Sequence, residues 1–245
     1  MQNIEIAGAQ GGYLDEGAGP PLVLLVTPFI TADLYWPTRR ALMRSFRVIT
    51  VELPGTASHP SSHTWSFEAY AQWTAELLDR LALDCPLLIG HSSGGAIALM
   101  TGLLRPRQLC GVVLADAVGM ETSHSFAAVI AGCLLCVPVE LRFALRLFPR
   151  VASNLRRHTR NFLFQVVQAI RRNLRDQARR LAIPALVAWG AIDYVMPISG
   201  ARTLMRWAPH ARLYVCGRGS HDWLIVWPNE FAAAVERFAS GVRGG

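Results

Sequence analysis

The 245-residue chain contains no lysine, so arginine supplies all 24 of its basic residues. Charged residues make up only 17% of the chain, whereas apolar residues make up 52%. The apolar segment 126–139 includes Gly132 and is closed by Pro138, which leaves it too short to span a membrane. Residues 1–6 lack the basic start and the apolar stretch of a secretory signal. We therefore expect a globular protein with a large core and no stable membrane span.

Cysteine is scarce, and its positions do not suggest a disulfide framework. The five cysteines are odd in number and lie mostly among apolar neighbours, which favours reduced core residues and a cytoplasmic protein. One C-x-x-C pair is present, but no second pair follows at the spacing of a zinc site, so we expect it to pack on one helix face. The cysteines are Cys85, Cys110, Cys133, Cys136 and Cys216.

Short apolar runs alternate with helical patterns through most of the chain. This alternation predicts an α/β fold with a mostly parallel central sheet and helices on both faces. The opening residues 3–7 and 12–15 are expected to add an antiparallel hairpin at one edge. Buried strands are predicted at 22–26, 48–51, 87–89, 111–115, 185–189 and 211–215, and helices at 32–45, 66–83, 94–104, 199–207 and 228–239.

Residues 120–181 interrupt this alternation. They contain no convincing strand, and apolar residues recur at helical spacing, as at Leu141, Leu145 and Phe148. This segment contains eleven arginines and three acidic residues and so has a net charge of +8, while the rest of the chain has a net charge of −1. The arginines form either a solvated outer face or an attractor for anionic substrates, acyl carriers or a membrane surface. With few aromatic residues between them, they give little support to nucleic-acid binding.

Ser92 lies between Gly90 and Gly94, where the apolar strand ending at Ile89 meets a helix of small and apolar residues. A serine hydroxyl is a weak nucleophile at neutral pH and needs a base beside it. A sharp strand-to-helix turn exposes such a serine, and it brings the flanking positions so close that only very small side chains fit. The pattern G-x-S-x-G in this context is typical of a nucleophile elbow, although alone it also fits an ordinary turn.

Partners for Ser92 are expected after later strands, because the carboxyl ends of parallel strands meet at one edge of the sheet. Asp193 follows the strand 185–189, and a glycine-rich loop after the last strand delivers His221. Asp116, after the strand 111–115, is the main rival for the acid. Asp222 is poorly placed to orient the ring of its neighbour His221. The order Ser92, Asp193, His221 is the one that hydrolases with such an elbow use.

Together these segments resemble the α/β-hydrolase family over nearly the whole chain. Besides the elbow, the segment 189–193 resembles the one that carries the family's acid, and the residues from His221 to Phe231 resemble its histidine loop and last helix. Glu52-Leu53-Pro54-Gly55 resembles the family's Asp-Leu-Pro-Gly turn, with glutamate for aspartate. The resemblance implies an α/β-hydrolase core formed by residues 1–119 and 182–245, with 120–181 inserted as a helical cap.

The resemblance and general chemistry assign roles to single residues. Ser92 would be the nucleophile, His221 the general base and acid, and Asp193 the group that orients the imidazole. The oxyanion hole would use the backbone N–H groups of Ser93 and Phe29. Many relatives have His-Gly-x where this chain has Thr27-Pro28-Phe29, and the Phe29 ring would crowd the acyl side of the pocket. Two further side chains are expected beside the substrate pocket, namely His91 and Trp223.

The sequence therefore predicts a serine hydrolase that cleaves a carboxylic ester, lactone or thioester of a partly apolar small molecule. No metal or organic cofactor is expected. Hydrolysis of a carbon-carbon bond, or perhydrolysis of the haloperoxidase kind, could use the same three residues. A receptor that binds a small apolar molecule without turnover is a further alternative. A homodimer is left open.

Overall fold

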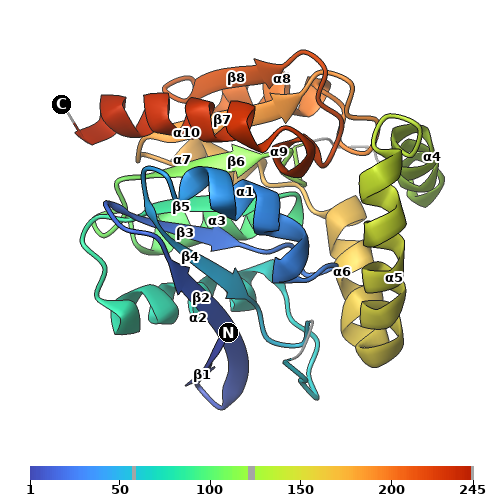
Figure 1. The fold of residues 1–245 in the computed structure, drawn as a ribbon, viewed down its shortest axis with the longest axis horizontal. Coiled ribbons are helices and arrows are strands. Elements are labelled where there is room, and N and C mark those ends of the chain that lie inside the picture. The colour runs from blue at the N-terminus through green and yellow to red at the C-terminus, as the bar shows by residue number, and fades with distance from the viewer. Residues whose placement is uncertain (57–58, 121–124, 244–245) are drawn as a thin grey trace.

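The computed structural model describes residues 1–56, 59–120 and 125–243. Its centre is an eight-stranded sheet in the order β1-β2-β4-β3-β5-β6-β7-β8 (Figure 1). The strands are β1 (Gln2–Ile6), β2 (Ala9–Glu16), β3 (Pro21–Leu25), β4 (Arg47–Glu52), β5 (Leu87–His91), β6 (Gly111–Ala115), β7 (Ala185–Gly190) and β8 (Arg212–Cys216). All six predicted strands and the predicted hairpin are present.

Six strands, β3 to β8, run parallel to one another, and only β1 and β2 are antiparallel to their neighbours. Every residue of β5, β6 and β7 is buried. Strands that are covered on both faces need such continuous apolar runs, because neither face reaches water. The carboxyl ends of β5, β6 and β7 therefore meet at one edge of the sheet, where the polar residues that follow them gather.

Helices cover both faces of the sheet, and each face has its own apolar core. One core is formed with α2 (Phe67–Leu81), α3 (Ser93–Leu104) and α8 (Ser199–Trp207). The other is formed with α1 (Trp36–Leu42), α9 (Trp223–Val226) and α10 (Pro228–Arg243). The single helix predicted at 32–45 is shorter than expected. It is divided into a 3-10 turn, η1 (Ala32–Tyr35), and α1, and Pro37 lies in the first turn of α1.

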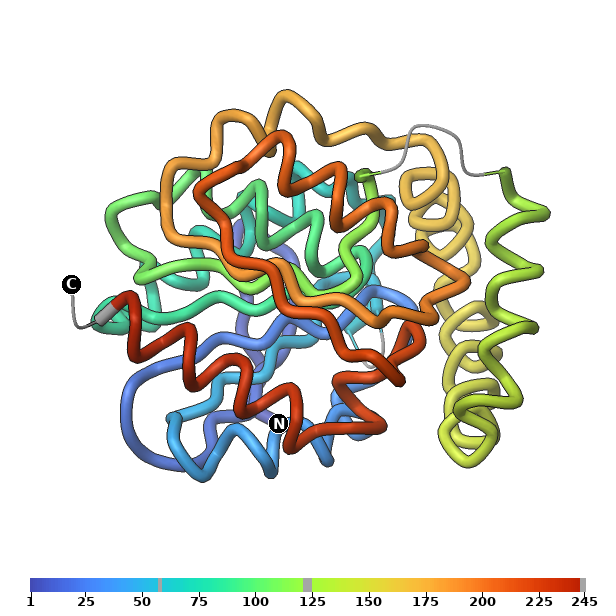
Figure 2. The backbone as a smooth tube through the Cα atoms, turned by 90° about the horizontal axis from the view of Figure 1, so that it is seen from above, coloured from blue at the N-terminus to red at the C-terminus, as the bar shows by residue number. Residues whose placement is uncertain are grey.

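The described part of the predicted insertion, residues 125–181, contains four helices and no strand. They are α4 (Phe126–Cys136), α5 (Leu141–Arg157), α6 (Thr159–Arg171) and α7 (Arg175–Arg180). The first three gather at one end of the molecule, whereas α7 packs against α3 and α8 (Figures 1 and 2). Residues 121–124, at the start of the predicted insertion, lie outside the described residues. Within the described residues, no helix is long and apolar enough to cross a membrane.

Buried amide side chains attach α6 to the core. The Asn161 Nδ2 group donates to the carbonyl of Gly55, and the Gln168 Nε2 group donates to the carbonyl of Trp65. In return, the backbone N–H of Trp65 donates to Asn161 Oδ1. Buried polar groups are costly unless they are paired, so these bonds fix one orientation of α6 relative to the sheet. Apolar packing alone would restrict that orientation less.

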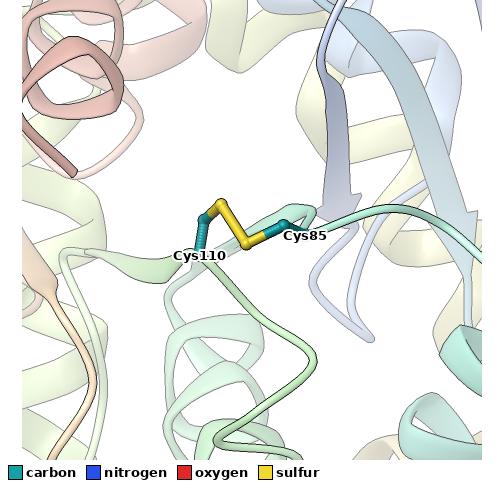
Figure 3. The surroundings of a disulfide bond; sticks show 2 residues. All are labelled: Cys85 and Cys110. Atoms are coloured by element: carbon teal, nitrogen blue, oxygen red, sulfur yellow. A yellow bond between two sulfur atoms is a disulfide. The ribbon is translucent and has the colours of Figure 1, made fainter. Parts of the chain in front are cut away.

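The expectation of five reduced cysteines is wrong. Cys85 and Cys110 form a disulfide, while Cys133, Cys136 and Cys216 are free (Figure 3). Cys85 precedes β5 and Cys110 precedes β6, and these two strands are neighbours. The bond therefore joins the amino ends of the strands, at the edge opposite Ser92. It also removes the cysteine argument on which the expected cytoplasmic location partly rested.

Loss of this disulfide is expected to lower stability without affecting the site. Closing a loop of 25 residues stabilises a fold by about 3 kcal/mol, which corresponds to a fall in Tm of roughly 6–12 °C for a chain of this size. Calorimetry of Cys110→Ser should show that fall, and reductant should reproduce it in the native protein. The matched control is Cys133→Ser, which removes an exposed free thiol and should leave Tm unchanged. Equal Tm values for all three proteins would contradict the predicted role of the bond.

Candidate active site

Ser92 lies in the sharp turn between the end of β5 and the start of α3. Its backbone has φ +55° and ψ −120°, a strained conformation for a residue with a side chain. A Cβ atom at Gly90 would lie 2.0 Å from the carbonyl oxygen of Gly94, so no larger residue fits there. The backbone N–H of Ser92 donates to the carbonyl of Ala115 on the adjacent strand. The sheet and the helix thus hold the serine in its strained position.

The ring of His221 connects Ser92 to Asp193. Its Nδ1–H donates to Asp193 Oδ2 at 2.8 Å, and its Nε2 accepts from the Ser92 hydroxyl at 3.1 Å. Both distances are those of ordinary hydrogen bonds. Asp193 and His221 are buried, and the Ser92 residue is 7% exposed. The structure therefore brings together the three residues that the sequence predicted after three different strands.

Asp193 is held by its own loop. Its second carboxylate oxygen, Oδ1, accepts from the backbone N–H groups of Val195 and Met196 at 2.7 and 2.8 Å. Oδ2 is thereby directed at His221. A carboxylate with this many donors stays in one orientation, so it also fixes the orientation of the imidazole that it binds.

The rival acid, Asp116, makes other bonds. Its Oδ1 accepts from the backbone N–H of Gly190 at 2.8 Å, and its Oδ2 accepts from Trp223 Nε1 at 2.7 Å. The residue is fully buried, and burial together with the nearby charge of Asp193 raises the pKa of the Asp116 carboxyl well above its usual range. Asp116 therefore links the ends of β6 and β7 to α9, and Asp193 occupies the position beside His221.

Acidic groups surround His221. Burial alone would lower the pKa of this imidazole, but the charge and hydrogen bond of Asp193, aided by Asp222 and Asp116, raise it well above 6.5. Burial raises the pKa of Asp222 to about 6 and, together with the charge of Asp222, that of Glu140 to about 7. Among the described residues, no group of three or more histidine, cysteine or acidic residues is arranged to hold a metal ion.

Both expected pocket residues, His91 and Trp223, are packed in the interior. His91 Nε2–H donates to the carbonyl of His221, and its Nδ1 accepts from the hydroxyl of Tyr35. Burial, followed by the charge of His221, lowers the pKa of His91 to about 3, so the ring is neutral and can make both bonds. Trp223 is fully buried, and its indole N–H donates to Asp116. No polar atom of either ring is left for a substrate, because every ring nitrogen already has a hydrogen-bond partner within the protein.

The loop after β3 holds the expected oxyanion donor, Phe29. Within the described residues, neither the backbone N–H of Phe29 nor that of Ser93 donates a hydrogen bond to another backbone group. The carbonyl of Pro28 accepts from the Asn154 side chain of α5. The rings of Phe29 and Phe162, the latter on α6, pack in a T shape with their centroids 5.1 Å apart. The loop is therefore positioned by α5 and α6 as well as by the sheet.

Sequence reasoning did not identify Tyr35 or Asn154 as parts of the site. Tyr35 lies in η1, 56 residues from the histidine that it bonds, and Asn154 lies in an arginine-rich helix, 126 residues from Pro28. The spacing along the chain gives no indication of either contact. The one available indication was chemical, since an asparagine on the buried side of a helix needs a polar partner.

Known proteins resemble this chain over most of its length. It is 25% identical over 263 residues to a 2-hydroxymuconate semialdehyde hydrolase from Pseudomonas putida, covering 97% of this chain and 93% of the relative. It is 24% identical over 251 residues to a pimeloyl-[acyl-carrier protein] methyl ester esterase from Aeromonas hydrophila, covering 91% and 96%. A membrane phospholipase A structure superposes with a TM-score of 0.86 at 18% identity, covering 100% of this chain and 86% of the other.

The family comparison covers the six parallel strands, β3 to β8, and the candidate site. The model of the "Alpha/beta hydrolase family" matches residues 23–243, which include the elbow, Asp193 and His221. The relatives above are named hydrolases, and the strand order and helix layers agree with the fold that the sequence predicted. The chain belongs to the alpha/beta hydrolase family and is an enzyme of that family.

Proposed function

We propose that this protein is a serine hydrolase that cleaves a carboxylic ester, lactone or thioester of a partly apolar small molecule. The observation that carries the proposal is the position of the His221 ring between Ser92 Oγ and Asp193 Oδ2, 3.1 Å from the one and 2.8 Å from the other. A base in contact with the serine, itself oriented by a carboxylate, is the arrangement that nucleophilic catalysis by serine needs.

The first half of the reaction transfers the acyl group to the enzyme. As Ser92 Oγ attacks the acyl carbon, its proton passes to His221 Nε2, and the charge of Asp193 stabilises the imidazolium that forms. The negative oxygen of the tetrahedral intermediate faces the N–H groups of Ser93 and Phe29. Each such donor contributes on the order of 3 kcal/mol. Collapse of the intermediate breaks the bond to the leaving group, which takes the proton from His221.

The second half of the reaction releases the acyl group as the free carboxylic acid. Water gives a proton to His221 Nε2 and attacks the acyl carbon of the Ser92 ester, and the imidazolium then returns the proton to Ser92 Oγ. The helices α4 to α6 act as the cap, because α5 and α6 contact the loop of Phe29 and α4 lies against Tyr194, the residue after Asp193. Such a cover excludes bulk water and shapes the acyl pocket.

A second candidate is hydrolysis of a carbon-carbon bond in a dicarbonyl compound. It is favoured by the similarity to the 2-hydroxymuconate semialdehyde hydrolase, which extends over 97% of this chain. The similarity to the methyl ester esterase extends over 91% of this chain, so the extent of similarity does not favour one of the two reactions over the other. Turnover of a panel of esters, lactones and thioesters beside a 2-hydroxy-6-oxo dienoate would separate them directly.

An active-site probe tests the nucleophile. A fluorophosphonate should label the native protein, because its electrophilic phosphorus reacts with an activated serine, and Ser92→Ala should not be labelled. Mass analysis of the modified peptide identifies the residue. Ser93→Ala is the matched control, since its hydroxyl is not the one bonded to His221, and it should still be labelled. A native protein that stays unlabelled would indicate the alternative of a receptor without turnover.

Substitution of the two buried aspartates, Asp193 and Asp116, is expected to affect kcat and Tm differently. Asp193→Asn keeps the shape of the side chain but loses the charge that orients and stabilises His221, so kcat should fall on the order of 10⁴-fold. Asp116→Asn should reduce kcat less than about tenfold and should chiefly lower Tm, because its bonds are to Gly190 and Trp223. Steady-state kinetics and calorimetry of both variants decide the assignment. A larger kinetic loss in Asp116→Asn would transfer the role of the acid to that residue.

The raised pKa of His221 predicts the pH dependence. The ring must be neutral to accept the Ser92 proton, so activity is lost as the pH falls through its pKa. Because that pKa is raised well above 6.5, the acid limb of kcat/KM for a soluble ester should have its midpoint above pH 6.5. A plateau that extends below pH 6 would contradict the shift.

A further inference from the structure

Exposed apolar side chains gather on the cap helices. Of the nineteen large hydrophobic side chains that are exposed in the described residues, twelve lie between Phe126 and Val167. Figures 1 and 2 show α4 and α5 on the outside of this end of the molecule, with α6 beside α5. Single exposed hydrophobic residues are normal on a protein, but a concentration of them on neighbouring helices marks an interaction surface.

The helix α4 has no charged residue in its eleven positions. The Phe126 and Leu134 residues are 60% and 64% exposed. The helix lies on the core through Gly132, where a Cβ atom would be 2.1 Å from the carbonyl oxygen of Tyr194. An apolar helix that buries only one narrow side leaves most of its surface without a partner among the described residues.

The helix α5 has apolar and basic stripes side by side. Leu141, Leu145 and Phe148 follow each other at helical spacing and are all exposed. Arg142 and Arg146 lie one position after the first two of these, on the adjoining side of the helix, and neither forms an ion pair within the described residues. We name the exposed side chains of Phe126, Ile130, Leu134, Leu141, Leu145, Phe148, Arg142 and Arg146 the cap face.

The positive charge of these helices indicates which partner binds the cap face. The helices α4 and α5 together contain five arginines and no acidic residue, so a second copy would place two positive surfaces against each other. Helices with apolar side chains on one side and arginines beside them bind at the interface of a bilayer, where the apolar groups enter the acyl boundary and the cations meet lipid phosphates. An anionic phospholipid surface is therefore complementary to both features of the cap face.

The buried side of α4, opposite the cap face, lies next to the candidate active site. Tyr194, which Gly132 of α4 touches, directly follows Asp193 in the chain. The thiol of Cys136, at the end of α4, lies against backbone groups of Tyr194 and His221. We infer that the cap face binds the surface of anionic phospholipid membranes and so brings the site of Ser92 to acyl esters held in the bilayer. The choice of substrate rests on the proposed function, whereas the binding of the surface does not.

Vesicle flotation tests the binding step with the full chain. The native protein should float with vesicles that mix phosphatidylcholine and phosphatidylglycerol, more weakly with phosphatidylcholine alone, and less at high salt. The double variants Leu145→Gln/Phe148→Gln and Arg142→Gln/Arg146→Gln should each weaken binding about tenfold or more. The matched control is Leu213→Gln/Arg202→Gln, which changes exposed residues on β8 and α8 and should bind like the native protein.

Turnover of a soluble short-chain ester by the same proteins separates this inference from the proposed function. The cap-face variants should retain that turnover, and Ser92→Ala should float although it is inactive. Flotation without any esterase activity in the native protein would remove the proposed function and leave the binding surface in place. Esterase activity without flotation would overturn the inference, as would equal flotation of all variants. A dimer that the Leu145→Gln/Phe148→Gln change dissociates, without flotation, would overturn it in favour of a second copy.

Discussion

The close approach of the backbone at Gly90 and Gly94 is the constraint on which the site depends. It allows β5 to turn directly into α3, and this turn holds Ser92 at φ +55° with its hydroxyl 3.1 Å from His221. The loops that follow β7 and β8 then supply Asp193 and His221, because these strands run parallel to β5 and end at the same edge of the sheet. Strain at one residue is maintained by the buried strands and helix around it.

Polar contacts position the loops around the turn that carries Ser92. His91 and Trp223 each use a ring N–H to bind the His221 loop or Asp116, and Asn154 ties the cap to the loop of Phe29. The helices α4 and α5 each pack one side against the core, and buried amides attach α6. The outer sides of α4 and α5 are thus left apolar and basic, which connects the architecture of the cap to the binding surface that we infer.

Much of the fold and the three residues at its centre could be predicted from the sequence, because both depend on local patterns. Continuous apolar runs identify buried strands, and residues that follow parallel strands converge whatever their separation in the chain. The disulfide could not be predicted, since Cys85 and Cys110 become neighbours only because β5 and β6 pair. The packed positions of His91 and Trp223 depend on Tyr35 and Asp116, which are distant in sequence.

Catalysis by Ser92 requires a covalent acyl-enzyme intermediate on that residue, and this intermediate can be trapped. An activated ester is mixed with the native protein, the mixture is quenched in acid within the first turnover, and the digest is analysed by mass spectrometry. The acyl mass is expected on the peptide that contains Ser92 and on no other. Hydrolysis that proceeds with no acylated peptide, or with the acyl group on another residue, would contradict it.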